Sequence, residues 1–237
     1  MSLVLSLQYL LRENKGTVMD KSEIVTLSAP DSPAAEAYRA LRVNLDYASL
    51  DISLKTLVVS APAPEGDRSV WAEVAVNLAV VAAQAGQTVV LVDADLRRPC
   101  LHEFLELSNE VGLTQAIVSL DEPLPLCPTD VPGLSVLTSG ALPPNPVDIL
   151  SSQKMSDLLE NLAGQADLVI LSAPPVTISA DAAVLGAKTD GLLLAVRSGH
   201  TRRDRIEQAK EALERFKVHL LGAVLTDAPE GKLLTAY

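Results

Sequence analysis

Two carboxylates and two cationic side chains directly follow an apolar run within Thr88–Pro99, TVVLVDADLRRP. The apolar part is typical of a parallel strand that is buried on both faces. It ends at Asp93 and Asp95, and Arg97 and Arg98 come next. In a parallel sheet these charged groups would lie at the carboxyl edge, where open α/β sheets bind ligands. The alternative is a strand that leads into an ordinary solvated turn.

The loop over residues 62–69, PAPEGDRS, stands between another apolar run and a long helical segment. A strand, a loop and a helix form the frame of a phosphate-binding loop, in which backbone N–H groups, a lysine and a Ser or Thr surround the phosphate. This loop meets the requirements poorly. Pro62 and Pro64 have no N–H, only Gly66 adopts positive φ without strain, Asp67 would repel phosphate, and lysine is absent. Its residues alone therefore do not identify a nucleotide site.

Strands and helices alternate along the chain, which predicts an α/β domain with a mostly parallel, twisted sheet and helices on both faces. Apolar runs predict strands over residues 55–61, 88–93, 134–138, 167–171, 191–197 and 219–225. Helices are predicted over residues 33–49, 69–85, 101–105, 113–120, 147–162, 179–187 and 202–216, with a Pro-rich connection over 122–132.

The composition favours one large globular domain. The chain has 237 residues, of which 48% are hydrophobic and only 3% aromatic, and this suits helices packed on a parallel sheet. A net charge of −11 argues against a general nucleic-acid-binding surface, so we expect no nucleic-acid partner. Cys100 and Cys127 form neither a metal-binding spacing nor a disulfide framework, which indicates a reducing, cytoplasmic environment.

We expect three regions in the chain: an N-terminal segment and linker over residues 1–31, the α/β domain over 32–227 and a flexible C-terminal tail over 228–237. The first region holds an apolar stretch, Leu3–Leu11. This stretch is too short to span a bilayer and lacks the basic leader and cleavage site of a signal peptide. It is a candidate for a short amphipathic helix that packs on the domain or on a partner.

Several stretches together resemble the cytoplasmic domains of bacterial tyrosine kinases (BY-kinases), which belong with MinD and ParA to the deviant P-loop ATPases. They are SPAAEAYRALRVNL, NLAVVAAQAGQTVVLVDADLRRP, EVGLTQAI, GLSVLTSGALPPNPVDILSS, DLVILSAPPV and DGLLLAVRSGHTRR. The resemblance covers residues 32–227 and implies a P-loop NTPase-like fold that binds ATP or ADP with Mg. It also implies that Asp93 and Asp95 position Mg and activate the acceptor hydroxyl or a water.

The phosphate loop of the family reads approximately PGEGKS, whereas this chain has PEGDRS over residues 64–69. Aligned without gaps, Arg68 falls on the family's lysine and Ser69 on its Mg-binding serine. Pairing Gly66 with the last glycine instead puts Asp67 on the lysine. Lysine is absent in either alignment, and Arg is longer and planar, so it is not an equivalent point charge. The nucleotide and Mg ligands implied by the resemblance are Gly66, Arg68, Ser69 and Asp93.

Three further features depart from the family pattern. Ser172 stands in DLVILSAPP where the family has the second aspartate of DLVILDTPP, which helps to hold Mg through water. A hydroxyl binds Mg more weakly than a carboxylate does. Thr226 stands where the family often has an Asn that contacts adenine. The tyrosine cluster that these kinases phosphorylate is missing, and only Tyr237 stands near the C-terminal end.

These departures predict a catalytically degenerate member of the family, a pseudokinase, because phosphoryl transfer relies on positioning and on neutralising charge. The acidic motif would then persist because it holds the sheet edge together, for example through pairs between Asp93 or Asp95 and Arg97 or Arg98. The alternative is an active protein-tyrosine autokinase or ATPase with a rebuilt phosphate loop.

The family's assembly motif, Glu–x2–Arg–x2–Arg, is intact as Glu36, Arg39 and Arg42, which lie along one side of a predicted helix. The resemblance implies self-association through these residues; the alternative is an ordinary exposed helix face. It further implies a role in exopolysaccharide or capsule biosynthesis or export, with a membrane chain-length regulator (polysaccharide co-polymerase) as partner at the cytoplasmic face. A third reading is a MinD/ParA-like positioning factor attached to the membrane through Leu3–Leu11.

Overall fold

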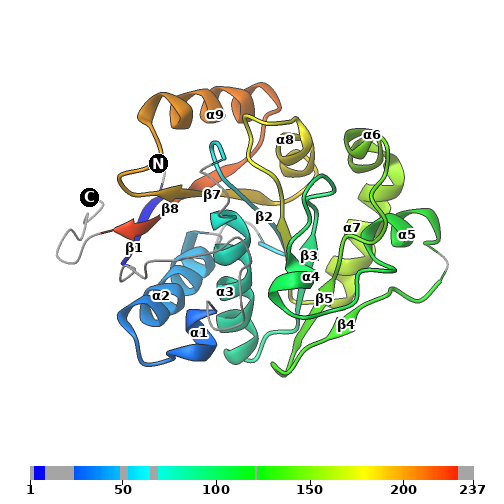
Figure 1. The fold of residues 1–237 in the computed structure, drawn as a ribbon, viewed down its shortest axis with the longest axis horizontal. Helices are drawn as coiled ribbons and strands as arrows, with labels where there is room; N and C mark the ends of the chain where they lie inside the picture. Colours follow the sequence, from blue (N-terminus) through cyan, green and yellow to red (C-terminus); the bar gives the residue numbers. More distant parts are fainter. Residues whose placement is uncertain (1–2, 9–23, 49–52, 65–68, 121, 229–237) are drawn as a thin grey trace.

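The computed structural model describes residues 3–8, 24–48, 53–64, 69–120 and 122–228, with an eight-stranded sheet at its centre (Figure 1). The strands are β1 (Leu3–Gln8), β2 (Thr56–Ser60), β3 (Val89–Asp93), β4 (Cys127–Pro128), β5 (Leu134–Leu137), β6 (Leu168–Ser172), β7 (Gly191–Arg197) and β8 (Leu220–Ala228). Their order is β1-β8-β7-β2-β6-β3-β5-β4, and every neighbouring pair is parallel except β5 with β4. The mostly parallel sheet predicted from the sequence is therefore confirmed.

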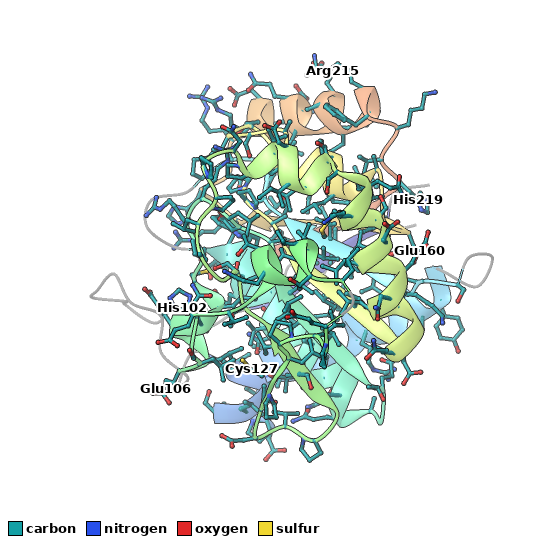
Figure 2. The ribbon with its side chains drawn as sticks, turned by 90° about the vertical axis from the view of Figure 1, so that its right-hand side faces the viewer. His102, Glu106, Cys127, Glu160, Arg215 and His219 are labelled. Carbon is teal, nitrogen blue, oxygen red and sulfur yellow. The ribbon has the colours of Figure 1, made fainter. Side chains whose placement is uncertain are left out.

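Helices cover both faces of this sheet, as predicted. They are α1 (Val25–Ser28), α2 (Pro33–Ala48), α3 (Val70–Gln84), α4 (Leu101–Phe104), α5 (Leu113–Val118), α6 (Pro146–Ser151), α7 (Gln153–Gln165), α8 (Asp181–Gly186) and α9 (Arg203–Arg215). Buried residues of α1 to α4 form one apolar layer with the sheet, and those of α5 to α9 form the other. Figure 2 shows the molecule from the side, with Arg215 of α9 far from Glu106, which follows α4.

β3 is buried on both faces, as the sequence predicts for this strand. Val89 and Leu91 pack into the layer of α1 to α4, whereas Val90 and Val92 pack into the layer of α5 to α9. The strand lies between β5 and β6, so both of its backbone edges are paired. A strand in this position needs an apolar residue on each face, which explains why no polar residue interrupts it before Asp93.

α3 is an apolar helix enclosed on all sides. Its residues are buried without interruption from Val70 to Ala83. It packs on β2, β3, β6 and β7 and is covered from outside by α1 and α2. A helix without a polar face is stable only when it is buried in this way. The packing fixes the start of α3, next to Ser69, at the carboxyl edge of the sheet.

The N-terminal part of the chain differs from the prediction. Leu3–Gln8 forms strand β1, parallel to β8, rather than an amphipathic helix. A short apolar run does not distinguish strand from helix by periodicity, and here the open backbone edge of β8 decides. The expected linker also contains structure, because Ile24 and Thr26 are fully buried around α1. Residues 9–23 and most of the expected C-terminal tail, 229–237, lie outside the described residues.

The helix predicted over residues 147–162 is two helices, α6 and α7, which meet at Ser152. Ser152 has extended backbone angles, φ −62° and ψ 157°, and its hydroxyl accepts a hydrogen bond from the N–H of Met155 at 3.2 Å. The residue is thus the N-cap of α7, and a cap ends the preceding helix. Within the described part of the chain, no helix is both long enough and apolar enough to cross a bilayer.

A buried polar contact fastens α1 to α3. The backbone N–H and the hydroxyl of Thr26 both donate to Oδ1 of Asn77, at 3.1 and 2.9 Å. The amide nitrogen of Asn77 donates to the carbonyl oxygen of Glu73 at 3.0 Å. Thr26 and Asn77 are both 0% exposed, so water cannot replace these contacts.

We expect Asn77→Ala to lower the free energy of unfolding by about 2–4 kcal/mol, because two buried donors of Thr26 lose their acceptor. Urea denaturation measures this loss. Asn161→Ala, at an exposed position of α7, is the matched control and should leave the stability nearly unchanged. Equal effects of the two substitutions would contradict the role of the Thr26–Asn77 contact.

Candidate functional site

The carboxyl ends of β2, β6 and β3 lie side by side in the middle of the sheet. Asp93, the last residue of β3, is in register with Ser172, the last residue of β6. Ser172 is in turn in register with Val59 of β2. The parallel topology therefore brings the acidic motif, the segment after β6 and the predicted phosphate loop to one edge of the sheet, where α/β folds bind ligands.

The carboxylate of Asp93 is fully buried and accepts three backbone hydrogen bonds. Oδ2 accepts from the N–H groups of Cys100 and Leu101, at 3.0 and 2.9 Å, and Oδ1 accepts from the N–H of Asp95 at 3.3 Å. These contacts close the turn between the end of β3 and the start of α4. Burial nevertheless raises the pKa of Asp93 to about 7, and the hydrogen bonds only partly oppose this shift.

The carboxylate of Asp95 organises the next part of the same turn. Its Oδ1 accepts from the N–H groups of Arg97 and Arg98, at 3.1 and 2.9 Å. The side chain is nearly buried, and this burial raises the pKa of Asp95; the negative charge of Asp181 raises it further. Asp93 and Asp95 therefore both serve as acceptors for the backbone of the segment that follows them.

The guanidinium of Arg97 pairs with Asp181 in the first turn of α8. Nε and Nη2 of Arg97 lie 2.7 and 3.2 Å from the two carboxylate oxygens, and Asp181 is 0% exposed. This corrects the expected pairing of Arg97 or Arg98 with Asp93 or Asp95: those carboxylates bind the backbone, and the described ion pair of Arg97 is with Asp181. Asp181 is absent from the predicted site residues. The sequence gives no signal for this contact, because the two residues are 84 positions apart in the chain.

The predicted phosphate loop is described only at its two ends, because Gly66 and Arg68 lie outside the described residues. Its start is fastened to the segment after β6, since the N–H groups of Val176 and Thr177 donate to the carbonyl oxygens of Ala61 and Pro62. At its end, Ser69 is half-buried and stands before the first residue of α3.

Cys100 joins Ser69 to the acidic motif. The Cys100 thiol lies within hydrogen-bonding reach of the Ser69 side chain, and its backbone N–H donates to Asp93. Burial and the negative charge of Asp93 raise the pKa of the thiol, so Cys100 stays protonated at neutral pH. The structure thus brings together Ser69, Asp93 and Asp95, which the sequence predicts as site residues.

Two hydroxyls at this edge lack the partners that buried polar groups normally have. Ser172 is 0% exposed, and its Oγ has no hydrogen-bond partner among the described residues. Thr226, near the end of β8, is 1% exposed and its Oγ1 also has none. Both stand at positions where the resemblance implies residues that contact Mg or adenine. Tyr237 lies outside the described residues.

The described residues offer a Mg²⁺ ion few direct ligands. Mg²⁺ prefers carboxylate oxygens and an octahedral arrangement. Both oxygens of Asp93 already bind backbone N–H groups, and Ser69 and Ser172 offer only neutral hydroxyls. In the described ranges, no group of three or more His, Cys, Asp or Glu side chains is placed to hold a metal.

The predicted assembly residues lie on α2, which packs against α3. Nε of Arg39 lies 2.8 Å from Glu36, and its Nη2 donates to the carbonyl oxygen of Pro30 at 2.7 Å. Arg42 pairs with Asp46 at 2.8 Å. The Glu36 side chain is 71% exposed and that of Arg39 is 39% exposed, so the motif is available at the surface.

Known proteins resemble this chain in sequence and in structure. No known protein-family model matches the chain. The chain is 38% identical to tyrosine-protein kinase YwqD of Bacillus subtilis over 218 residues, which are 91% of this chain and 90% of YwqD. It is 34% identical over 197 residues to tyrosine-protein kinase Etk of Escherichia coli K12, but it spans only 27% of that longer protein.

Solved structures of related proteins share the fold of this chain. The chimerical protein CapA2B2 has a TM-score of 0.84 at 30% identity, over 97% of this chain and 96% of that one. The kinase domain of E. coli Etk has a TM-score of 0.83 at 30% identity, over 98% and 92%. MinD of Pyrococcus horikoshii, complexed with Mg-ADP, has a TM-score of 0.57 at 17% identity over 73% and 70%, a likeness of fold alone.

The predicted motifs, the sheet and the relatives all point to the same group of proteins. The match to YwqD extends over nine tenths of both chains at more than one third identity. The chain therefore belongs to the family of bacterial tyrosine-protein kinases, the BY-kinases.

Proposed function

We propose that this chain is a catalytically degenerate BY-kinase, which acts as a regulatory or assembly subunit in exopolysaccharide or capsule biosynthesis or export. The observation that carries this proposal is the neutral hydroxyl of Ser172, which stands beside Asp93 in the sheet register. Phosphoryl transfer depends on placing cations against the phosphates, and a serine cannot supply the negative charge that holds them.

The environment of Ser172 supports this proposal. The residue is fully buried at the end of β6, and its Oγ binds no group in the part of the chain that the structure describes. The sequence adds that residues 62–69 contain no lysine. The chain thus lacks both the lysine and the second aspartate that the family resemblance implies for the phosphates and the metal.

One contact favours the second candidate function, an active ATP-dependent tyrosine autokinase. Ser69 reaches Cys100, whose N–H binds Asp93, so the end of the phosphate loop and the acidic motif are neighbours. In that case Arg68 and Ser69 would serve a rebuilt phosphate loop, with Mg and ATP as cofactors. A direct binding and turnover measurement separates the two candidates.

We expect calorimetry to show Mg-ATP and Mg-ADP binding no tighter than about 1 mM, and a parallel assay to show no ATP turnover. Ser172→Asp should strengthen Mg-ATP binding about tenfold, because it supplies a carboxylate beside Asp93. Ser151→Asp, at an exposed position of α6, is the control. Turnover by the parent protein that Asp93→Ala abolishes would establish the active kinase instead.

We also expect the stability to depend on the charge of Asp93. Its pKa is about 7 in the folded chain and 3.8 as the ordinary value, so the folded state binds the proton more tightly. Between these pH values the free energy of unfolding therefore falls as pH rises, by up to about 4 kcal/mol. Urea denaturation should show the stability of the parent relative to Asp93→Asn shrinking from about pH 4 to about pH 7.5.

Asp148→Asn, an exposed substitution in α6, controls for the loss of one charge and should leave the pH dependence as in the parent. If the parent and Asp93→Asn instead keep a constant difference over this range, Asp93 is already ionised in the folded chain and its burial is not decisive.

The proposed assembly surface consists of Glu36, Arg39 and Arg42 on α2. Two arginines on one exposed helix suit an interface, because guanidinium groups pair geometrically with carboxylates of a neighbouring copy. The proposed membrane partner is a chain-length regulator (polysaccharide co-polymerase), which would hold this chain at the cytoplasmic face. Etk is several times longer than this chain, and this supports the proposal that the kinase-like domain works together with a further protein segment.

We expect Arg39→Glu combined with Arg42→Glu to raise the dissociation constant for self-association at least about tenfold, because both cations of the surface are reversed. Size-exclusion chromatography with light scattering measures this change. Arg203→Glu with Lys210→Glu, which reverses two exposed cations of α9, should leave assembly unchanged. Assembly that survives the α2 substitutions would exclude this surface.

A further inference from the structure

Three buried carboxylates meet around the turn after β3. Asp93 and Asp181 are 0% exposed and Asp95 is 2% exposed. The N–H of Asp95 donates to Asp93. The N–H of Arg97 donates to Asp95 and its guanidinium binds Asp181, so a chain of hydrogen bonds connects the three carboxylates. Buried carboxylates of like charge are stable only when hydrogen-bond donors or cations balance them.

The donors are divided unequally among the three carboxylates. Backbone N–H groups serve Asp93 with three hydrogen bonds and Asp95 with two. Asp181 receives the guanidinium of Arg97 through both of its oxygens, at 2.7 and 3.2 Å. A bidentate pair of this kind is among the strongest side-chain contacts and fixes orientation as well as charge.

Arg97 connects two elements at once. Its backbone N–H donates to Asp95 within the turn after β3, whereas its guanidinium binds Asp181 in the first turn of α8. These residues are 84 positions apart in the chain. Rotation of the turn would therefore break either the contact with Asp95 or the contact with Asp181. The side chain of Arg97 remains 39% exposed, so the pair lies at the rim of the cluster.

We propose that the Arg97 guanidinium is the resident cation of this acidic cluster and that Asp181 is the positioning residue that holds it there. The proposal goes beyond the proposed function and concerns only the shape of the turn after β3. Asp181 then acts on the turn through Arg97, and the turn keeps its shape without nucleotide or metal. Removing Arg97 leaves the buried carboxylate of Asp181 without its cation.

The experiment uses the full chain, without nucleotide, in thermal unfolding with and without millimolar MgCl₂. The variants are Arg97→Gln, Arg97→Lys, Asp181→Asn and the double variant Arg97→Gln/Asp181→Asn, with Arg203→Gln at an exposed arginine of α9 as control. We expect Arg97→Gln to lower Tm by roughly 5–15 °C. Arg97→Lys should lower it less, because lysine keeps the charge but cannot bind both carboxylate oxygens as the planar guanidinium does.

Two results distinguish a resident cation from an ordinary structural contact. MgCl₂ should leave the Tm of the parent unchanged, because Arg97 already supplies the cation of the cluster. The double variant should be more stable than Arg97→Gln, because it removes the stranded charge together with its partner. If Arg97→Gln proves too unstable to purify, recovery of a folded double variant gives the same comparison.

A Tm for Arg97→Gln equal to that of Arg203→Gln would overturn the proposal, as would a parent protein that MgCl₂ alone stabilises. These outcomes are separable from the test of catalysis. ATP turnover by the parent, with the expected unfolding results, would end the pseudokinase assignment and leave Arg97 as the resident cation. Absence of turnover, with no effect of Arg97→Gln on Tm, would keep the pseudokinase assignment and end the proposal for Arg97.

Discussion

The carboxylate of Asp93 is the contact on which the carboxyl edge of this domain depends. Its oxygens receive three backbone N–H groups from the segment that leads to α4, at a point where no solvent reaches. A turn in this environment must satisfy its backbone donors internally, and the strand end supplies the acceptor. The position of Asp95, of Arg97 and of the first residues of α4 all follow from that closure.

Much of the fold could be predicted because its strands are buried on both faces. Such strands read as continuous apolar runs, and α3 reads as a helix without a polar side. The failures occur where tertiary contacts decide. The strand β1 depends on the open edge of β8, which local periodicity does not reveal. The break between α6 and α7 occurs because the Ser152 hydroxyl caps α7. Serine is tolerated both inside a helix and at its N-cap, so the sequence does not reveal this break.

The candidate site was predictable in its location but not in its contacts. Charge at the end of a buried strand indicates the carboxyl edge, and this placed Asp93 and Asp95 correctly. The expected pairs of those residues with neighbouring arginines were wrong, because the backbone is closer and satisfies the carboxylates first. The true partner of Arg97 comes from α8, and single-sequence patterns carry no signal for a contact between elements so far apart.

The acidic motif therefore has a reason to persist apart from catalysis. Substituting Asp93 would leave three buried backbone donors without an acceptor, and each such donor destabilises a fold by about 1–3 kcal/mol. Among the described residues, by contrast, the Ser172 hydroxyl binds no neighbouring group. Residues with a structural role resist change, whereas residues that serve only a ligand are free to diverge once the ligand is no longer required. In the proposed degenerate kinase, this difference would leave the aspartates intact beside an altered phosphate loop.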